Sequence, residues 1–379
     1  MKATRRYAAG LAAIVTTTAG LLAGTGLTAG SASAGGFGAF VGPLHHTSVL
    51  ASTVPGNGDV NPYGVAVVPR SRGDLHRGNV LVSNFNDKAN VQGTGTTIVQ
   101  VTPGGRVSLF AKINHHLRGC PGGVGLTTAL TALRSGWVIV GSLPTRNGSI
   151  SGPGCLIVLD QWGHVRETFT GGGINGPWDM TSLDLGNQAV LFVTNVLNGT
   201  VRAKGHVVFG GTVLRLVIKI PAFGLPFIWF DTTIGSGFPE RTDPAALVIG
   251  PTGVGLGLGL GRNGVLYVAD TLDNRIAGIP NAVFRVFSDG PGFTVSRGHH
   301  LNGELGLVIA PNGDILTVNG GNGKLVEVTP FGFQIATRQL DSSGSPPGAG
   351  ALFGLAVKPG HDAVYYVDDA INTLNLLHH

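Results

Sequence analysis

The chain has 379 residues, 42% of them hydrophobic and only 12% charged, with 63 Gly, 21 Pro and 2 Cys, which excludes disordered, collagen-like and disulfide-rich proteins. Short runs of Val, Ile, Leu, Phe and Tyr between Gly, Pro and Asn favour strands over helices. The formal net charge is +5, but three basic residues lie before position 35, so the remaining 22 basic and 20 acidic residues leave +2, and nucleic acid is excluded as a partner.

Residues 1–34 have the pattern of a cleaved export signal. Lys2, Arg5 and Arg6 precede an uncharged run rich in Gly, Ala and Leu that ends in Ala32-Ser33-Ala34, a small-x-small cleavage site. A permanent membrane anchor is the alternative, but Thr and Gly interrupt the run. The Arg pair leaves both general and twin-arginine export open. We therefore expect a secreted or extracytoplasmic protein that starts at Gly35 and keeps no membrane span.

An internal repeat occupies residues 56–379, and its first landmark is an apolar-Gly-apolar-small run. A strand with Gly and a small residue inside it suits a crowded place where several backbones converge, such as the inner strand around a central channel. Six copies of this run begin at Tyr63, Val124, Trp178, Val254, Leu305 and Phe353.

The second landmark is a β-branched or aromatic strand that ends in a small polar residue. The endings are Asn84, Ser142, Asn195, Asp270, Asn319 and Asp369. Asn and Asp at such positions either bond the nearby backbone in a tight turn or present polar groups to a ligand. The third landmark is a Gly-containing hairpin, clearest at 101–107, 159–165 and 328–334. Together the landmarks predict four antiparallel strands per repeat.

Six such repeats predict an all-β, six-bladed β-propeller. The chain ends after only three strands of the sixth repeat. Ser48-Val49-Leu50-Ala51, within an N-terminal segment of residues 35–55, resembles Ser108-Leu109-Phe110-Ala111 in the outer strand of the first repeat. We therefore expect 48–51 to supply the missing strand and close the ring, which removes an exposed edge.

The fourth repeat carries a family resemblance. Val265-Leu266-Tyr267-Val268-Ala269-Asp270, followed by Asn274-Arg275-Ile276 and preceded by Asn263-Gly264, resembles an NHL repeat. The resemblance extends loosely over residues 56–377 and implies a six-bladed propeller. NHL-type propellers are binding platforms and, in some branches, lyases or lactonases, so the resemblance implies either a binding module or an enzyme.

In this topology the loops after the second and fourth strands of each blade leave at one end of the ring, where propellers usually meet ligands. Arg118 and Arg241 lie in or beside the loops between blades. Asp179 replaces Gly in the inner run, beside the channel, where a carboxylate would bind a cation, act as a general base or bond the backbone. The expected ligand-face residues are Asn84, Asn195, Asp270, Asn319, Asp369, Asp179, Arg118 and Arg241.

Cys120 and Cys155 fall at the same end of the second blade. In an oxidising compartment such a pair is expected to be bridged rather than free. A bridge that closes this loop is worth about 3 to 4 kcal/mol by the loop-entropy model. A nucleophilic thiolate is the alternative.

His115, His299 and Asp179 could supply nitrogen and oxygen ligands to a divalent metal, Ca or Zn, at the channel mouth. The alternative is that these loop histidines are solvated. Resemblance to gluconolactonase-like propellers implies a metal-binding Glu at the start of the first inner strand, but this chain has Asn61-Pro62-Tyr63-Gly64 there. The site of the amidating-lyase branch is not matched residue by residue.

Two functions are thus predicted from the sequence. The first is a non-catalytic, monomeric binding or scaffold propeller whose ligand is a protein, a glycan or a small molecule. The second is a metal-dependent lyase or hydrolase, lactonase-like or amidating-lyase-like, that uses the same face. Inward convergence of His115, His299 and Asp179 would separate the two.

Overall fold

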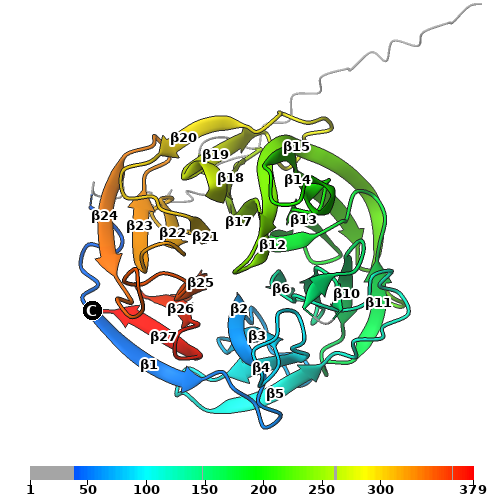
Figure 1. Cartoon of the computed structure of the whole chain (residues 1–379). Coiled ribbons are helices and arrows are strands. Elements are labelled where there is room, and N and C mark those ends of the chain that lie inside the picture. The colour runs from blue at the N-terminus through cyan, green and yellow to red at the C-terminus, as the bar shows by residue number, and fades with distance from the viewer. Residues whose placement is uncertain (1–37, 147, 260–262, 361) are drawn as a thin grey trace, which may run out of the picture. The chain divides into compact units, whose positions relative to one another are not determined.

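Six antiparallel sheets stand radially around a central axis in the computed structural model, which describes residues 38–379 except 147, 260–262 and 361 (Figure 1). The expected export signal lies outside the described residues. Among those that are described, no helix is long and apolar enough to cross a membrane. The predicted six-bladed propeller with four-stranded blades is confirmed.

Blades 1 to 5 run from an inner strand to an outer strand along the chain, and blade 6 takes its outer strand from the N-terminal part of the chain. Blade 1 is β2 (Val60–Val67), β3 (Val80–Asn86), β4 (Thr97–Val101) and β5 (Val107–Lys112). Blade 2 is β6 (Leu130–Ala132), β7 (Val138–Ser142), β10 (Cys155–Leu159) and β11 (Val165–Phe169), with a separate hairpin of β8 (Thr145–Arg146) and β9 (Ser149–Ile150). Blade 3 is β12 (Pro177–Asp184), β13 (Gln188–Asn195), β14 (Val208–Lys219) and β15 (Phe227–Asp243), extended by β16 (Leu247–Ile249).

Blade 4 is β17 (Pro251–Gly257), β18 (Val265–Asp270), β19 (Arg275–Pro280) and β20 (Phe293–Arg297). Blade 5 is β21 (Glu304–Ile309), β22 (Ile315–Asn319), β23 (Lys324–Val328) and β24 (Gln334–Gln339). Blade 6 is β25 (Leu352–Val357), β26 (Val364–Asp368), β27 (Thr373–His378) and β1 (His46–Ser52). The helical elements described are one turn of α-helix, α1 (Thr200–Ala203), and one 3-10 turn, η1 (Thr271–Asp273).

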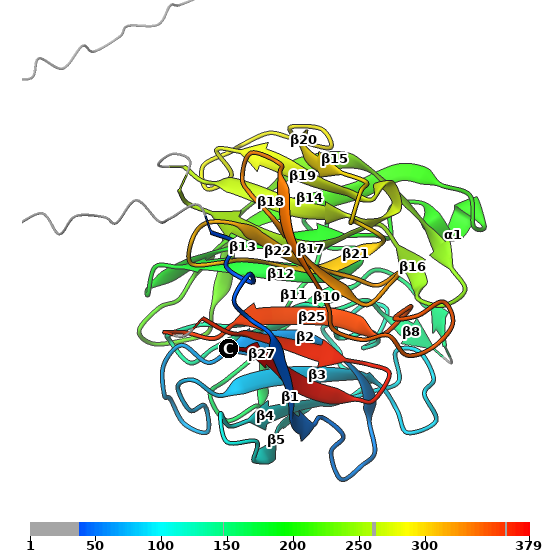
Figure 2. The ribbon, with the colours of Figure 1, turned by 90° about the vertical axis from the view of Figure 1, so that its left-hand side faces the viewer.

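The ring closes as predicted, because β1 pairs antiparallel with β27 and completes blade 6. Val49 lies opposite Asn375, and Ala51 lies opposite Leu374. Figure 2 shows β1, in blue, beside the red strands of the C-terminal blade. Because β1 pairs with β27, the outward edge of β27 is not left exposed.

The inner strands crowd one another, which explains the glycine column. A Cβ added to Gly354 would overlap the carbonyl oxygen of Tyr63 on the neighbouring strand, and one at Gly306 would overlap that of Phe353. Each of these strands has a register irregularity at this point, and the pairings make Gly64, Asp179, Gly253, Gly306 and Gly354 equivalent. In blade 4 the crowded glycine is therefore Gly253, two residues before the Gly255 that the sequence pattern indicated.

The core lies between the sheets rather than in one central mass. Between blades 1 and 2, for example, Leu81, Ile98, Val140 and Ile157 pack together with no exposed surface. The predicted disulfide between Cys120 and Cys155 is present, with the Cα atoms 5.3 Å apart and both cysteines buried. It ties the loop between blades 1 and 2 to the start of β10.

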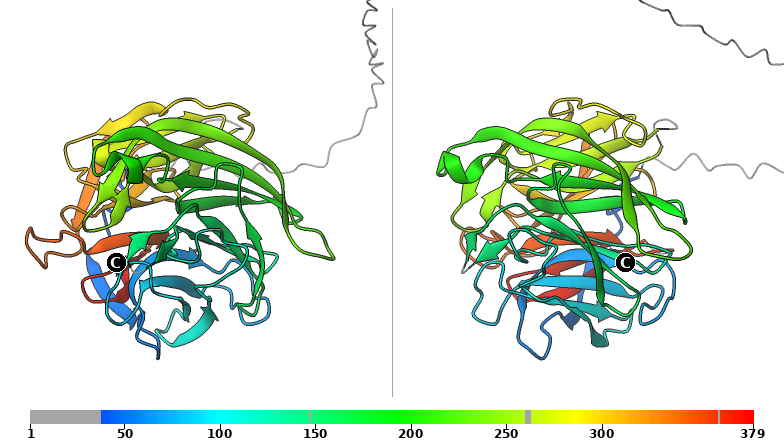
Figure 3. Two further views of the ribbon diagram at one scale, coloured as in Figure 1. Left: turned by 45° about the vertical axis from the view of Figure 1, so that its right-hand side comes forward. Right: turned by 90° about the vertical axis from the view of Figure 1, so that its right-hand side faces the viewer.

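The two ends of the ring differ. The capped end carries the loops 87–96 and 143–154, α1 and β16. The open end carries the loops after the first and third strands of each blade, including the tip 220–226 of the long β14–β15 hairpin. Figure 3 shows this hairpin, in green, projecting from the side opposite α1.

Candidate ligand groove and axial channel

An aromatic cluster fills the axis at the capped end. Tyr63, Trp178 and Phe353 occupy equivalent inner-strand positions in blades 1, 3 and 6, just before the crowded column. The indole Nε1 of Trp178 donates a hydrogen bond of 2.7 Å to the hydroxyl oxygen of Tyr63. The rings of Tyr63 and Phe353 have centroids 5.2 Å apart, and Phe85 packs edge-on against both. We call these four residues the aromatic plug.

Loops from three blades close over the aromatic plug. Gln92 of blade 1 donates from Nε2 to the carbonyl oxygen of Ala245, which precedes β16 of blade 3, at 3.2 Å. Thr145 of blade 2 donates from Oγ1 to the carbonyl oxygen of Gly93 at 2.9 Å. Leu126, Leu143 and Val248 are buried in the same cluster. Side chains therefore fill the axial mouth at the end where the sequence placed the ligand face.

Below the plug lies an axial channel of about 170 Å³. Its lining runs from Tyr63 and Asp179 to Val67, Ala132 and Ser182 at the far ends of their strands. Most of the wall is backbone and small or aliphatic side chain, because the inner strands approach too closely for larger ones. The channel is consequently a blind tube that faces the open end of the ring.

Asp179 is the carboxylate in the wall of this channel. Its Oδ1 accepts a hydrogen bond of 2.7 Å from the backbone N–H of Met180, and its own N–H donates to Oγ1 of Thr194. Burial raises the pKa of Asp179 to about 8, and the bond from Met180 lowers it only in part. At neutral pH the carboxyl therefore holds its proton and can act as an acid inside the channel.

This protonation makes the effect of Asp179→Asn depend on pH. The folded-state pKa lies above that of the unfolded chain, so stability falls as pH rises through this window, and above about 8 the full cost of a buried charge remains. Asn keeps the oxygen that accepts from Met180 and carries no charge. We expect the stability advantage of the variant over wild type to increase by about 4 kcal/mol when the pH is raised from 5 to 9.

Urea unfolding at both pH values measures this gain. Asp74→Asn is the matched control, because Asp74 is exposed in the loop after β2. A difference between Asp179→Asn and wild type that stays the same at pH 5 and pH 9 would show that the Asp179 carboxyl is ionised in both states.

The polar strand-end residues are buried and hold loops in place. Asn84 donates from Nδ2 to the carbonyl oxygen of Thr53 at 2.8 Å. Oδ1 of Asn195 accepts the N–H of Asn175, and Oδ1 of Asn319 accepts that of Asn302. These contacts support the turn-forming role of the landmark rather than direct contact with a ligand.

In blade 6 the equivalent position is Asp368, which pairs with Leu352 as Asn319 pairs with Glu304. Asp369, selected from the sequence, is the next residue and lies just beyond β26. Burial and the neighbouring Asp368 raise the pKa of Asp369 to about 7. Two adjacent aspartates made the register ambiguous in the sequence by one position.

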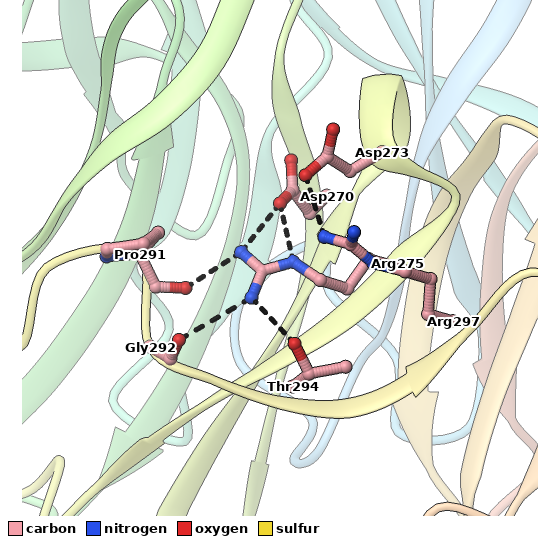
Figure 4. A network of polar contacts seen from close by, with 7 residues as sticks. All are labelled: Asp270, Asp273, Arg275, Pro291, Gly292, Thr294 and Arg297. Carbon is pink, nitrogen blue, oxygen red and sulfur yellow. Dashed lines mark hydrogen bonds and ion pairs between the residues drawn. The ribbon is translucent and has the colours of Figure 1, made fainter.

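Asp270 belongs to a buried charge network in blade 4 (Figure 4). Its Oδ2 accepts hydrogen bonds from Nε of Arg275 at 2.9 Å and from a terminal guanidinium nitrogen at 2.7 Å. The same guanidinium donates to the carbonyl oxygen of Pro291 at 3.0 Å. Burial raises the pKa of Asp270 to about 6, against the opposing effect of Arg275. This predicted ligand-face residue is committed to Arg275.

An open groove of about 460 Å³ lies off the axis at the capped end, between blades 1 and 2. The loop from β5 to β6 contributes His115, His116 and Arg118, and β8 contributes Arg146. Backbone from Gly122 and Gly123 forms the floor beside the disulfide. The described lining contains two arginines and no carboxylate, so the groove suits an anionic group. Two predicted residues, His115 and Arg118, thus meet in one recess.

The remaining predicted residues lie elsewhere. Arg241 lies at the capped end in β15, where its guanidinium pairs with Asp243 at 2.8 Å. His299 is exposed, with φ 54°, in the turn between blades 4 and 5. Within the residues that the structure describes, no three His, Cys, Asp or Glu side chains gather in a way that could hold a metal ion. The structure thus shows no such gathering of His115, His299 and Asp179 among the described residues, and their role as metal ligands stays a prediction.

Sequence reasoning missed the aromatic plug and Arg146. Tyr63, Trp178 and Phe353 share one column of the repeat, and a comparison of that column would have identified three aromatic residues at one level of the axis. Arg146 had no such signal, because its place beside Arg118 depends on the β8–β9 hairpin.

Comparisons with known proteins agree with the propeller. No family model and no curated protein matches the sequence. A gluconolactonase from Xanthomonas campestris matches with a TM-score of 0.54 at 11% identity, over 88% of this chain and 89% of its own. A streptogramin B lyase matches with a TM-score of 0.51 at 14% identity, over 87% of this chain and 96% of its own. A luciferin-regenerating enzyme matches with a TM-score of 0.55 at 11% identity, over 88% of this chain and 96% of its own.

The chain is thus similar in fold to six-bladed propellers that include enzymes. Identities this low show a common architecture. The resemblance of blade 4 to an NHL repeat stays a prediction.

Proposed function

We propose that the protein is a non-catalytic binding propeller that holds an anionic ligand in the groove between blades 1 and 2. The observation that carries the proposal is the aromatic plug. It fills the axial mouth at the capped end and leaves the recess beside His115 and Arg118 open at that end. We place the protein in an extracytoplasmic compartment, which the disulfide supports.

The ligand chemistry follows from the lining of the groove. Arg118 and Arg146 present guanidinium groups, which bind carboxylate, sulfate or phosphate oxygens by paired charge-assisted hydrogen bonds. The disulfide fixes one wall, so less conformational entropy is lost when the ligand binds. An acidic glycan or an acid-bearing small molecule has this chemistry.

Calorimetry with trigalacturonate, inorganic sulfate and phosphate tests the groove, with methyl-esterified trigalacturonate as the uncharged partner. We expect at least one anion to bind and Arg118→Gln/Arg146→Gln to weaken it by about tenfold or more, since a hydrogen bond to a charged group is worth about 1.5 to 3 kcal/mol. Arg202→Gln, exposed on α1 at the same end, should leave the affinity unchanged. Anion binding that survives the double substitution would place the ligand elsewhere.

Asp179 favours a second candidate function, an enzyme that works in the axial channel. A carboxyl that holds a proton near neutral pH has the property of a general acid. The same ligand mixtures, analysed by mass spectrometry after incubation, separate the two functions. Conversion of a ligand that is lost in Asp179→Asn would establish the enzyme, whereas recovery of the intact ligand supports the binding module.

A further inference from the structure

We propose that the open end of the ring is a membrane-docking face that binds the surface of an anionic phospholipid bilayer. Apolar side chains project there from the connections of four blades. They are Trp162, Leu185, Phe223, Leu258, Phe331 and Phe333. Phe223 is 94% exposed and Phe331 is 76% exposed, so neither side chain is used for packing within the chain.

The fold brings these tips to one end. Trp162, Phe223 and Phe331 each lie between the third and fourth strands of a blade, and Leu185 and Leu258 lie between the first and second. In an antiparallel blade both kinds of connection leave at the same end. The neighbouring inner strands keep one direction around the ring, because the channel lining passes from Tyr63, Asp179 and Gly354 to Val67, Ser182 and Ala356 together.

The longest tip is the connection of the β14–β15 hairpin, Pro221-Ala222-Phe223-Gly224-Leu225-Pro226. It has no charged residue, and five of its six members are exposed. Aromatic and aliphatic side chains on short loops without charge are suited to the interface between lipid headgroups and acyl chains. Figure 3 shows the hairpin reaching beyond the blades at this end.

Charge beside the tip indicates the kind of membrane. A recess of about 650 Å³ is lined by Arg70, Arg72 and Arg134 together with Pro221 and Gly224 of the tip. All three arginines are exposed. Two nearby carboxylates are paired, Asp184 with Arg134 and Asp160 with Arg166, while Asp74 is exposed in the same loop as Arg70 and Arg72. Arg70 and Arg72 can therefore contact lipid phosphates while Phe223 enters the headgroup layer.

A fluid bilayer fits this arrangement better than a folded protein does. The apolar tips stand on separate loops around the ring and do not form one continuous groove. Lipids adapt to separated insertions, whereas a protein partner needs a contiguous complementary surface. The site is at the opposite end from the proposed ligand groove, so its failure would not affect that proposal.

Vesicle flotation with the full secreted chain tests the proposal, using phosphatidylcholine vesicles with and without 30% phosphatidylglycerol. We expect binding to the anionic vesicles to be at least tenfold stronger than to the neutral ones. Phe223→Ser/Phe331→Ser should lower it by about tenfold or more, because two apolar groups leave the interface. Phe209→Ser is the matched control and should leave vesicle binding unchanged, because Phe209 is 72% exposed on β14 but lies at the capped end.

Arg70→Gln/Arg72→Gln should lower binding to the anionic vesicles by about tenfold and reduce its sensitivity to salt. Arg202→Gln/Lys204→Gln removes the same charge from α1 and its C-cap at the capped end, and should leave vesicle binding unchanged. No binding to anionic vesicles, or equal binding by the Phe223/Phe331 variant, overturns the proposal. The proposal is also overturned if wild type does not bind vesicles and sediments as a dimer, while Phe223→Ser/Phe331→Ser sediments as a monomer. A second copy of the chain would then be the occupant of this face.

Discussion

Arg275→Met is expected to lower the unfolding free energy at pH 8 by about 3 to 5 kcal/mol, the usual cost of removing one partner of a buried ion pair. Arg275 and Asp270 are both buried, with 2.7 Å between their charged atoms. Met fills much of the guanidinium's space but leaves Asp270 without its counter-ion. It also leaves the carbonyl oxygen of Pro291 without this donor.

The neighbouring Glu304 adds to this cost. Its carboxyl is fully buried, and burial raises its pKa to about 8. Backbone hydrogen bonds from Glu304 and Arg275 and the charge of Arg275 partly offset this rise, and the charge of Asp270 increases it. Without Arg275 the two carboxyls would have to share protons at neutral pH.

The pH dependence of the stability loss in Arg275→Met tests whether the ionised carboxyl of Asp270 causes that loss. The pKa of Asp270 is already raised, to about 6, so its ionised form is present mainly above that pH. Removing Arg275 should raise it further, and the loss measured by urea unfolding should therefore be smaller at pH 5 than at pH 8.

Arg297→Met is the control for this prediction. Arg297 pairs with Asp273 at 2.9 Å, with both side chains substantially exposed, so its removal should cost at most about 1 kcal/mol. Equal losses for Arg275→Met and Arg297→Met would show that burial does not decide the effect.

The architecture was predictable from the sequence because its signals are local and repeated. Gly64, Gly306 and Gly354 recur where inner strands crowd, and the hairpin glycines recur at fixed offsets. The closing strand was predictable because Val49 lies in a run that matches the outer strand of blade 1. The disulfide followed from the position of two cysteines in one blade.

The candidate site was less predictable, because it depends on which residues of different blades meet. His115 and His299 lie in loops on different sides of the ring, a separation that the repeat pattern does not encode. The plug contact between Tyr63 and Trp178 joins residues 115 positions apart. The ring also places Arg134 beside Arg70 and Arg72, although no basic run exists in the sequence.

The sequence predicted that β1 would pair with the C-terminal blade, but it did not predict how the residues before β1 are held. Residues 38–45 lie against blades 5 and 6. There, buried Glu327 accepts the N–H of Phe40 at 2.6 Å and that of Val41 at 2.9 Å. Phe40, Val41 and Leu44 are buried in the core between these blades.

Glu327→Ala is expected to lower the unfolding free energy by about 3 to 6 kcal/mol, because two charge-assisted hydrogen bonds of about 1.5 to 3 kcal/mol each are lost from a buried site. The segment before β1 should then detach first. Arg338 donates from Nε to the carbonyl oxygen of Leu44 at 2.8 Å and would remain as the second attachment.

Hydrogen exchange and limited proteolysis measure the two consequences separately. The amides of Phe40 and Val41 should exchange far faster in Glu327→Ala, and cleavage should appear within residues 38–45 while the blades stay protected. Glu167→Ala is the control, because Glu167 lies on the outer strand of blade 2 and, among the described residues, its carboxylate accepts a hydrogen bond only from the N–H of adjacent Thr168. If Phe40 and Val41 stay protected in Glu327→Ala, their burial in the core rather than the carboxylate holds the segment. The ring would then be fastened by apolar packing and the pairing of β1 with β27.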